Sequence, residues 1–199
     1  MSPSYSVAFE GPPADLAARS LPIRKVREPL VRVHASRFGP IYFSRDDYRF
    51  SGPGSPYPVC YASVSLLGAF AETCLSQYPD LSFAVSARKV WAHSHTLITL
   101  SAPLSLVDLT GNKLVGIGTT LLINSTDQYD ITQQWAAAIH DHPSAPDGIY
   151  YQANHAGGER SVAIFDHARD HLIPGPAIPF TSDDILDGLL DALGVALIY

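Results

Sequence analysis

Residues 60–73 read CYASVSLLGAFAET and predict a strand that runs directly into a helix. The strand is expected at VCYAS (59–63), and the helix from about residue 64 to residue 77. Ser63 is the predicted N-cap, because a serine side chain commonly accepts a hydrogen bond from a free amide of the first helical turn. Pro79 lies just past the predicted end of the helix, which is typical of a helix stop.

A single carboxylate, Glu72, lies on the small face of this predicted helix. Ser65, Gly68 and Ser76 share that face, since residues three or four apart lie above one another. The opposite face carries the apolar residues needed for core packing: Leu66, Leu67, Phe70 and Cys74. Gly68 costs about 1 kcal/mol of helix propensity relative to alanine. We therefore expect backbone or a ligand to approach there closely, and a solvent-facing helix side is the alternative.

The remaining pattern predicts strands, a helix, strands, a helix and strands in alternation. Residues 29–34 (PLVRVH) are the first strand, 91–110 form two strands broken at Ala102-Pro103, and 147–155 pair with 161–166 around the turn AGGE. Two helices are expected at 130–143, capped by Asp130 or Thr132, and from Ser182 to a stop at Gly194. These elements predict an α+β fold with mainly antiparallel split sheets and a few helices. We expect one domain over residues 23–199, preceded by an arm, 1–22, that docks loosely or not at all.

The composition is that of an ordinary folded protein of 199 residues, with 46% hydrophobic and 16% charged residues. The N-terminus lacks the features of a secretory signal, and apolar runs fall short of the roughly 18 residues that span a membrane. We expect a cytoplasmic protein without a membrane contact. Cys60 and Cys74 are predicted to be reduced core residues, because their spacing fits neither a disulfide framework nor a zinc site.

The charge is unevenly distributed along the chain. The net charge of −6 argues against sequence-independent binding to nucleic acid, which needs many phosphate contacts. Eight of the 13 basic residues nevertheless lie in the first 50 positions: Arg19, Arg24, Lys25, Arg27, Arg32, Arg37, Arg45 and Arg49. This segment is suited to hold a small phosphorylated ligand, and solvated surface arginines are the alternative.

A carboxylate such as Glu72 above small residues suits glycosidic chemistry. It can bind a ribose hydroxyl and stabilise the oxocarbenium cation that forms when an N-glycosidic bond breaks. Arginines can hold phosphates with two hydrogen bonds, and a tyrosine can stack on a planar base. The sequence places these residue types nearby, at Arg32, Tyr42, Arg49 and Tyr61.

The eight histidines do not form a recognisable metal-binding motif. His167 and His171 are four residues apart, and His140 and His142 flank Asp141, but neither pair has a third ligand at helical spacing. We interpret these histidines as surface or turn residues and expect no bound metal.

Two segments resemble the RES-domain family. RVHASRFGPIYFSRDDYRFSGPGSPYPVCYASVSLLGAFAET (32–73) is similar to its N-terminal half, and YDITQQWAAAIHDHPSAPDGIYYQANH (129–155) to its C-terminal block. The resemblance extends over roughly residues 29–166. It rests on an ordered set: an arginine, an Arg-Phe pair, a tyrosine, the helix glutamate and TQQWA.

The resemblance implies a toxin of a bacterial toxin–antitoxin pair, neutralised by an Xre-like antitoxin. Such toxins share the fold of the ADP-ribosyltransferase toxins and consume NAD as a substrate, by hydrolysis, by phosphorolysis or by transfer of ADP-ribose to a protein. By this resemblance Arg32 and Arg49 grip NAD and belong to the catalytic set. Tyr42 and Tyr61 line the nicotinamide and ribose pocket, and Glu72 is the catalytic glutamate.

The sequence departs from the family in one position. A serine is expected after DGIYY, where Ala153 stands, and Ser161 beyond the AGGE turn is not expected to replace it. Asn154 is the candidate for the missing hydrogen bond, which commonly contributes about 0.5–1.5 kcal/mol. Three alternatives to NAD degradation stay open. They are transfer of ADP-ribose to a protein, a nucleotide- or partner-binding module that is catalytically silent because of Ala153, and a nucleic-acid-binding domain that uses the basic first 50 residues.

Overall fold

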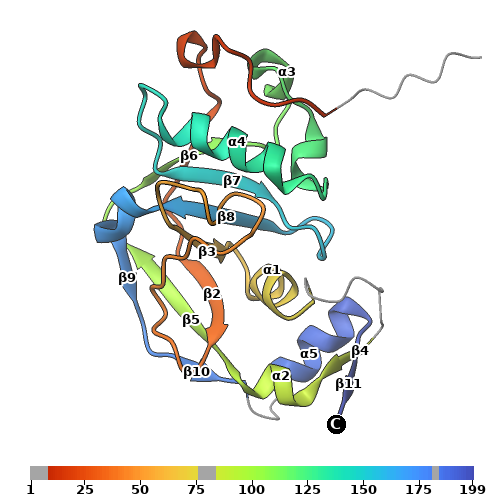
Figure 1. Cartoon of the computed structure of the whole chain (residues 1–199). Coiled ribbons are helices and arrows are strands. Elements are labelled where there is room, and N and C mark those ends of the chain that lie inside the picture. Colours follow the sequence, from red (N-terminus) through yellow and green to blue (C-terminus); the bar gives the residue numbers. More distant parts are fainter. Residues whose placement is uncertain (1–8, 76–83, 181–183) are drawn as a thin grey trace, which may run out of the picture.

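The computed structural model describes residues 9–75, 84–180 and 184–199. Its described residues form a curled sheet with helices at both ends (Figure 1), and the predicted α+β class is confirmed. The sheet runs in the order β1-β6-β7-β8-β3-β2-β5-β10, with β9 also paired to β5. Its strands are β1 Ile23–Val26, β2 Leu30–Ala35, β3 Val59–Ser63, β5 His93–Leu100, β6 Leu104–Asp108, β7 Gly148–Gln152, β8 Arg160–Phe165, β9 Leu172–Pro174 and β10 Ile178–Pro179.

The sheet is split between β2 and β3. These two strands share a single residue pair, Val31 with Ser63, whereas β2 and β5 pair from Leu30 with Ile98 to Ala35 with His93. Every neighbouring pair in the sheet is antiparallel except β6 with β7. The predicted mainly antiparallel split sheets are therefore present. The split separates β2 and β5 from the strands around β3 and β8.

Helix α1 (Leu66–Phe70) follows β3, as the quoted stretch predicts. Its N-cap is Ser65, whose Oγ accepts a hydrogen bond from the Gly68 amide over 3.0 Å. The prediction of Ser63 is wrong, because Ser63 stays in β3 and bonds Ser161 Oγ over 2.7 Å. The helix continues as a π-helical turn, η2 (Ala71–Leu75), a widened form of helix often found at functional sites. Ser76 and Pro79 lie outside the described residues.

Helix α4 (Tyr129–His140) covers the face formed by β3, β7 and β8 (Figure 1). Its buried side packs into the core through Trp135, Ala136 and Ile139. The predicted caps, Asp130 and Thr132, are wrong, because the N-cap is Gln128, whose side chain makes no capping hydrogen bond. The hydroxyl of Thr132 instead donates to the carbonyls of Arg49 and Tyr129. The short helices α3 (Leu114–Ile117) and η3 (Leu121–Asn124) add to this end.

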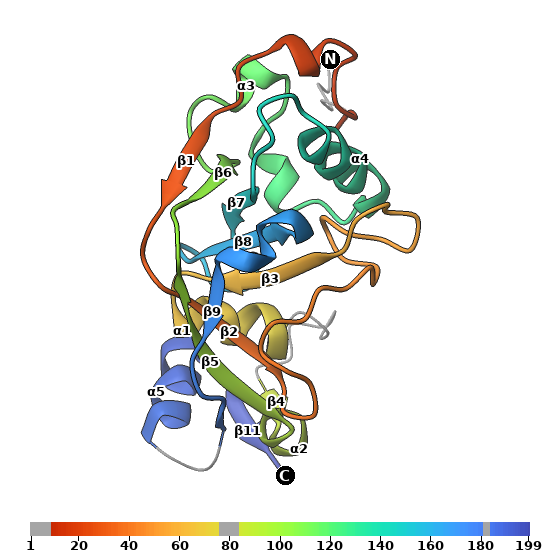
Figure 2. The same ribbon diagram turned by 90° about the vertical axis from the view of Figure 1, so that its left-hand side faces the viewer.

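The N-terminal segment packs onto α4 rather than docking loosely. In residues 9–22, Leu16 of η1 (Leu16–Ala18) is only 3% exposed and belongs to the same core as Trp135. The Trp135 Nε1 donates to the Glu10 carbonyl over 2.9 Å. Figure 2 shows this segment beside α3 and α4, at the end of the molecule opposite the C-terminus.

The other end holds a small parallel sheet of β4 (Ala84–Ser86) and β11 (Ala196–Ile198). Helices α2 (Ala87–Trp91) and α5 (Asp184–Leu193) lie beside it (Figure 1). Gly194, with φ +64°, ends α5 as predicted, because glycine adopts this left-handed conformation without strain. The predicted cap, Ser182, lies outside the described residues.

The structure also bears on the state of the two cysteines and on the expected lack of a membrane-spanning helix. Cys60 and Cys74 are buried and unbonded to each other, as predicted. Among the described helices, none is long and apolar enough to cross a membrane.

Candidate functional site

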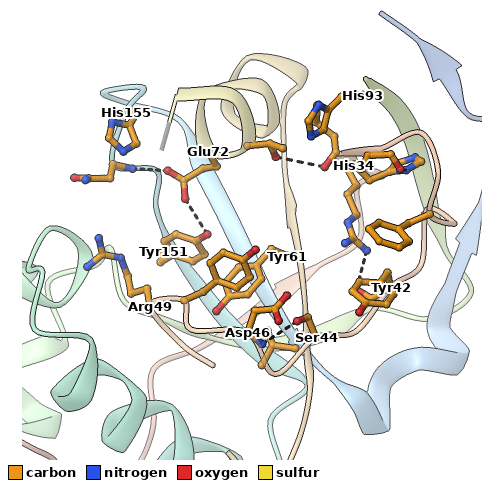
Figure 3. A pocket seen from close by; sticks show the side chains of 18 of the residues that line it. His34, Tyr42, Ser44, Asp46, Arg49, Tyr61, Glu72, His93, Tyr151 and His155 are labelled. Atoms are coloured by element: carbon orange, nitrogen blue, oxygen red, sulfur yellow. Dashed lines mark hydrogen bonds between the residues drawn. The ribbon is translucent and has the colours of Figure 1, made fainter. Parts of the chain in front are cut away.

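A cavity of about 310 Å³ opens beside the split between β2 and β3. This volume lies in the range of small-molecule sites. Its walls come from β2, the loop after it, β3, the π-helical turn and the end of β7 (Figure 3). The structure brings together in this one pocket all of the predicted site residues: Arg32, Tyr42, Arg49, Tyr61, Glu72 and Asn154.

Glu72 projects from the π-helical turn into the pocket wall and is half-buried. Its Oε2 accepts a hydrogen bond from the Tyr151 hydroxyl over 3.1 Å, and its Oε1 accepts one from the Asn154 amide over 2.9 Å. Both oxygens are thus fixed by donors from the end of β7 (Figure 3). The carboxylate keeps one orientation without any arginine or lysine in direct contact with it among the described residues.

Tyr151 is the principal site residue that the sequence analysis missed. Burial raises the pKa of its hydroxyl well above the usual value, and the negative charge of Glu72 raises it further. Tyr151 therefore stays protonated and acts as a donor to the carboxylate. The signal was present in the alternation of β7, in which Ile149 and Tyr151 face the core under α4 while Tyr150 faces the opposite core.

Asn154, the candidate for the missing hydrogen bond, reaches Glu72 through its backbone amide. Ala153, at the position expected to hold a serine, is 1% exposed and donates its amide to the Glu159 carbonyl. Ser161 faces Ser63 and does not line the pocket. A main-chain donor thus occupies the place where a side-chain hydroxyl was expected.

Gly68 is explained by a protein neighbour and not by a ligand. A Cβ at this position would lie 3.2 Å from Cβ of Glu159 and 3.4 Å from Cβ of Ser63. The carboxylate of Glu159, in turn, accepts a short hydrogen bond from the hydroxyl of Ser65. The turn between β7 and β8 therefore packs directly on α1, and this packing places Glu72 opposite Tyr151.

Arg49 is positioned by helix α4. Its side chain is 9% exposed, its Nη1 donates to the Thr126 carbonyl, and its guanidinium lies 5.3 Å from the ring centre of Tyr129. The hydroxyl of Thr132 bonds the Arg49 carbonyl, and Gln133 Nε2 donates to the neighbouring carbonyls of Tyr48 and Ser51 at 2.9 Å. The first residues of TQQWA therefore fix the loop that carries Arg49.

Arg32 contributes to the pocket and also holds its rim. Its Nη1 donates to the carbonyls of Pro40 and Tyr42, both at 2.9 Å, and lies 3.0 Å from Cys60 Sγ. These contacts fix the loop after β2 against β3. Tyr42, at 44% exposure, stacks on Phe38 with ring centres 5.3 Å apart, so the rim of the pocket carries an aromatic platform.

Tyr61 lies between the Glu72 end of the pocket and Tyr42 (Figure 3). Its hydroxyl accepts a hydrogen bond from the Phe50 amide over 3.0 Å and lies 3.2 Å from Ser51 Oγ. Burial raises the pKa of this hydroxyl, which stays neutral at physiological pH. Its ring meets that of Tyr48 edge-on, with centres 5.7 Å apart.

His34 is a second lining residue without a predicted role. Its Nδ1 lies 3.2 Å from the Ala35 carbonyl and its Nε2 lies 3.1 Å from Thr96 Oγ1. Burial lowers the pKa of this histidine, so the neutral ring is favoured. Among the other lining residues that the sequence analysis did not select are Ser44, Asp46, His93 and His155.

The RES domain family model matches residues 29–183. The chain belongs to the RES domain family. A protein named probable toxin y4kH, from Sinorhizobium fredii (strain NGR234), is 27% identical over an alignment of 111 residues, and the match covers 53% of this chain and 87% of that protein. The toxin chain in the crystal structure of the M. tuberculosis MbcT-MbcA toxin-antitoxin complex superposes with a TM-score of 0.64 at 16% identity. That match covers 92% of this chain and 98% of the other. It confirms the fold expected for a RES protein.

Proposed function

We propose that this RES protein is the toxin of a toxin–antitoxin pair and cleaves the bond between nicotinamide and ribose in NAD. The observation that supports it most strongly is the convergence of Glu72, Arg49, Arg32 and two tyrosines on one cavity. A carboxylate fixed by two donors is suited to a developing cation, and arginines are suited to a diphosphate. The named relatives, one a probable toxin and one a toxin bound to its antitoxin, support the toxin assignment and an antitoxin as partner. The Xre-like type of that antitoxin is proposed from the family resemblance alone.

The proposed reaction breaks the C–N bond of the nicotinamide ribose. The bonding electrons leave with the nicotinamide, whose ring loses its positive charge, and positive charge develops on the ribose. Glu72 stabilises this oxocarbenium-like charge through electrostatic attraction and a hydrogen bond to a ribose hydroxyl. The acceptor then adds to the ribose carbon and loses a proton: water gives ADP-ribose, phosphate gives ADP-ribose 1-phosphate, and a protein side chain gives an ADP-ribosylated protein.

Each remaining residue has a defined part in this proposal. Arg49 binds the diphosphate with the guanidinium nitrogens that do not bond Thr126. Arg32 also binds the diphosphate, while its Nη1 bonds the carbonyl of Pro40 at the rim of the pocket. Tyr61 and Tyr42 line the nicotinamide and ribose part of the pocket. Tyr151 and the Asn154 amide keep the Glu72 carboxylate in place. The bond cleavage is proposed to use no metal.

Product analysis tests this proposal and identifies the acceptor. Purified protein is incubated with NAD in buffer alone, in buffer with phosphate, and with a cell extract and NAD labelled in its ADP-ribose half. Free nicotinamide with ADP-ribose indicates hydrolysis, and nicotinamide with the 1-phosphate indicates phosphorolysis. A labelled protein indicates transfer. Nicotinamide release in none of the three mixtures would contradict NAD cleavage and favour a silent binding module.

A further inference from the structure

Two histidines and an aspartate meet where the end of α4 touches the start of η4 (Asp166–His171). His140 is the last residue of α4, and Asp166 and His167 are the first two residues of η4. Each of these three residues offers one potential ligand atom, and the three atoms lie within 4.8 Å of one another. None of them lines the NAD pocket.

His140 is already oriented as metal-binding histidines usually are. Its Nδ1 lies 2.7 Å from Oδ1 of Asp141, an acceptor that keeps the ring proton on Nδ1. The lone pair is therefore on Nε2, which lies 3.9 Å from Oδ1 of Asp166. Tyr57 stacks on the ring at 4.0 Å between centres, and Phe165 meets it edge-on at 5.1 Å. A carboxylate on the outer nitrogen is the usual way in which proteins fix the tautomer of a metal ligand.

His167 has a comparable outer acceptor. Its Nε2 lies 3.1 Å from the carbonyl of Pro146 and 4.0 Å from Oδ1 of Asp147. Since a carbonyl oxygen only accepts, this nitrogen carries a proton and Nδ1 keeps the lone pair. Both histidines are thus held with one nitrogen available for a cation.

The charge of the cluster also favours a cation. Three carboxylates, those of Asp141, Asp147 and Asp166, lie within 4.0 Å of the two imidazoles. Among the described residues, no lysine or arginine forms an ion pair with any of the three. A bound divalent ion would offset this excess of negative charge.

We propose that His140, Asp166 and His167 bind a zinc ion. Two imidazoles and one carboxylate are a common zinc ligand set, with water in the fourth position. The side chains of Asp166 and His167 are each 41% exposed, so small rotations can bring the ligand atoms to the roughly 2.0–2.2 Å that zinc requires. This site departs from the sequence-based expectation that these histidines bind no metal.

The proposed ion would link the end of α4 to the end of β8. The same helix fixes the loop of Arg49 through Thr132 and Gln133. Zinc would therefore stabilise the helix that supports the pocket, while taking no part in the cleavage of NAD. The inference is independent of the proposed function.

Zinc titration of the full, metal-free chain tests the site. We expect one zinc ion per chain by calorimetry and an upward shift of the melting temperature. His167→Gln and Asp166→Asn should each weaken zinc affinity at least tenfold, since loss of an outer-shell partner alone commonly costs about 10–100-fold. Both side chains are partly exposed, so both variants should fold. His171→Gln, in the same short helix, is the matched control and should bind zinc as the wild type does.

Two results would overturn the proposal. One is the absence of saturable zinc binding at one ion per chain. The other is binding that His167→Gln and Asp166→Asn leave unchanged, or that His171→Gln weakens equally. Glu72→Gln should bind zinc like the wild type, whatever its effect on NAD.

Discussion

The hydroxyl of Tyr151 donates a hydrogen bond of 3.1 Å to the carboxylate of Glu72. The two residues come from different elements, β7 and the π-helical turn after α1. The hydrogen bond from Ser65 to Glu159 connects α1 to the turn that follows β7. Tyr151 is only 3% exposed, so this hydrogen bond is shielded from most of the solvent, and it fixes the carboxylate at the pocket wall. In the proposed mechanism Tyr151 is a positioning residue for Glu72.

Tyr151→Phe should lower the rate of nicotinamide release about 10- to 100-fold, with little change in KM. The change removes one hydrogen bond to a charged group, which typically contributes about 1.5–3 kcal/mol. Steady-state kinetics with NAD would measure the effect. Tyr150→Phe is the matched control, because its ring lies on the opposite face of β7 outside the pocket. An unchanged rate in Tyr151→Phe would show that Glu72 needs no such positioning.

Arg49→Lys should raise the KM for NAD about tenfold or more. Lysine keeps the charge but loses the planar fork that can bond Thr126 and a phosphate at the same time. Arg45→Lys is the control, since Arg45 is exposed, bonds only the Pro56 carbonyl among the described residues, and lies outside the pocket lining. Equal KM values for the two variants would argue against diphosphate binding by Arg49.

Protonation of His34 should lower the free energy of unfolding in mild acid. Its pKa is lowered by burial, so the unfolded chain takes up a proton at a higher pH than the folded chain does. The neutral His34 ring therefore contributes its full share of folding stability above the usual histidine pKa of about 6.5. This contribution is lost as the pH falls from there through the lower pKa of the folded state. Urea unfolding at pH 7.5 and pH 5.5 should show a larger loss of unfolding free energy for the wild type than for His34→Gln. Equal losses would contradict this assignment.

Gly68→Ala and Gly188→Ala should change stability in opposite directions, although both glycines are helical. At Gly68 the added Cβ meets Glu159 and Ser63 side chains at 3.2 and 3.4 Å, and we expect a loss of about 1 kcal/mol, since overpacking commonly costs 1–3 kcal/mol. At Gly188 in α5 no atom lies within 4 Å of an added Cβ, so alanine should stabilise by up to about 1 kcal/mol. Thermal unfolding measures both. A stabilised Gly68→Ala would show that the contact with Glu159 can relax.

The sequence was sufficient to predict the elements that local patterns specify. The strand before α1, the two strands broken at Ala102-Pro103, the pair around AGGE and the stop at Gly194 are all present. The first helix was placed correctly, but its cap was not. Ser63 and Ser65 are equivalent as local capping residues, and only the pairing of Ser63 with Ser161 across the sheet decides between them.

The sequence was sufficient to predict which residues form the site, but not how they contact one another. Arg32 and Glu72 are recognisable from their neighbours in sequence, yet the contacts of Arg32 with the carbonyls of Pro40 and Tyr42 depend on how the loop folds. The alternation of β7 could place Tyr151 on the inward face of the strand, but its contact with Glu72 joins two elements that are distant in the sequence. The docking of Leu16 was missed, because the segment around it is rich in alanine and proline and has no periodic pattern.

The central claim is that Glu72 supports cleavage of NAD, and nicotinamide release by Glu72→Gln tests it most directly. Glu28→Gln, at an exposed position outside the pocket lining, is the matched control. Glutamine keeps the size of the side chain but removes the negative charge that stabilises the developing cation. We predict a loss of at least about a hundredfold in Glu72→Gln, by analogy with the removal of one oxyanion-stabilising donor, and wild-type release in Glu28→Gln. Wild-type release by a folded Glu72→Gln protein would contradict the account.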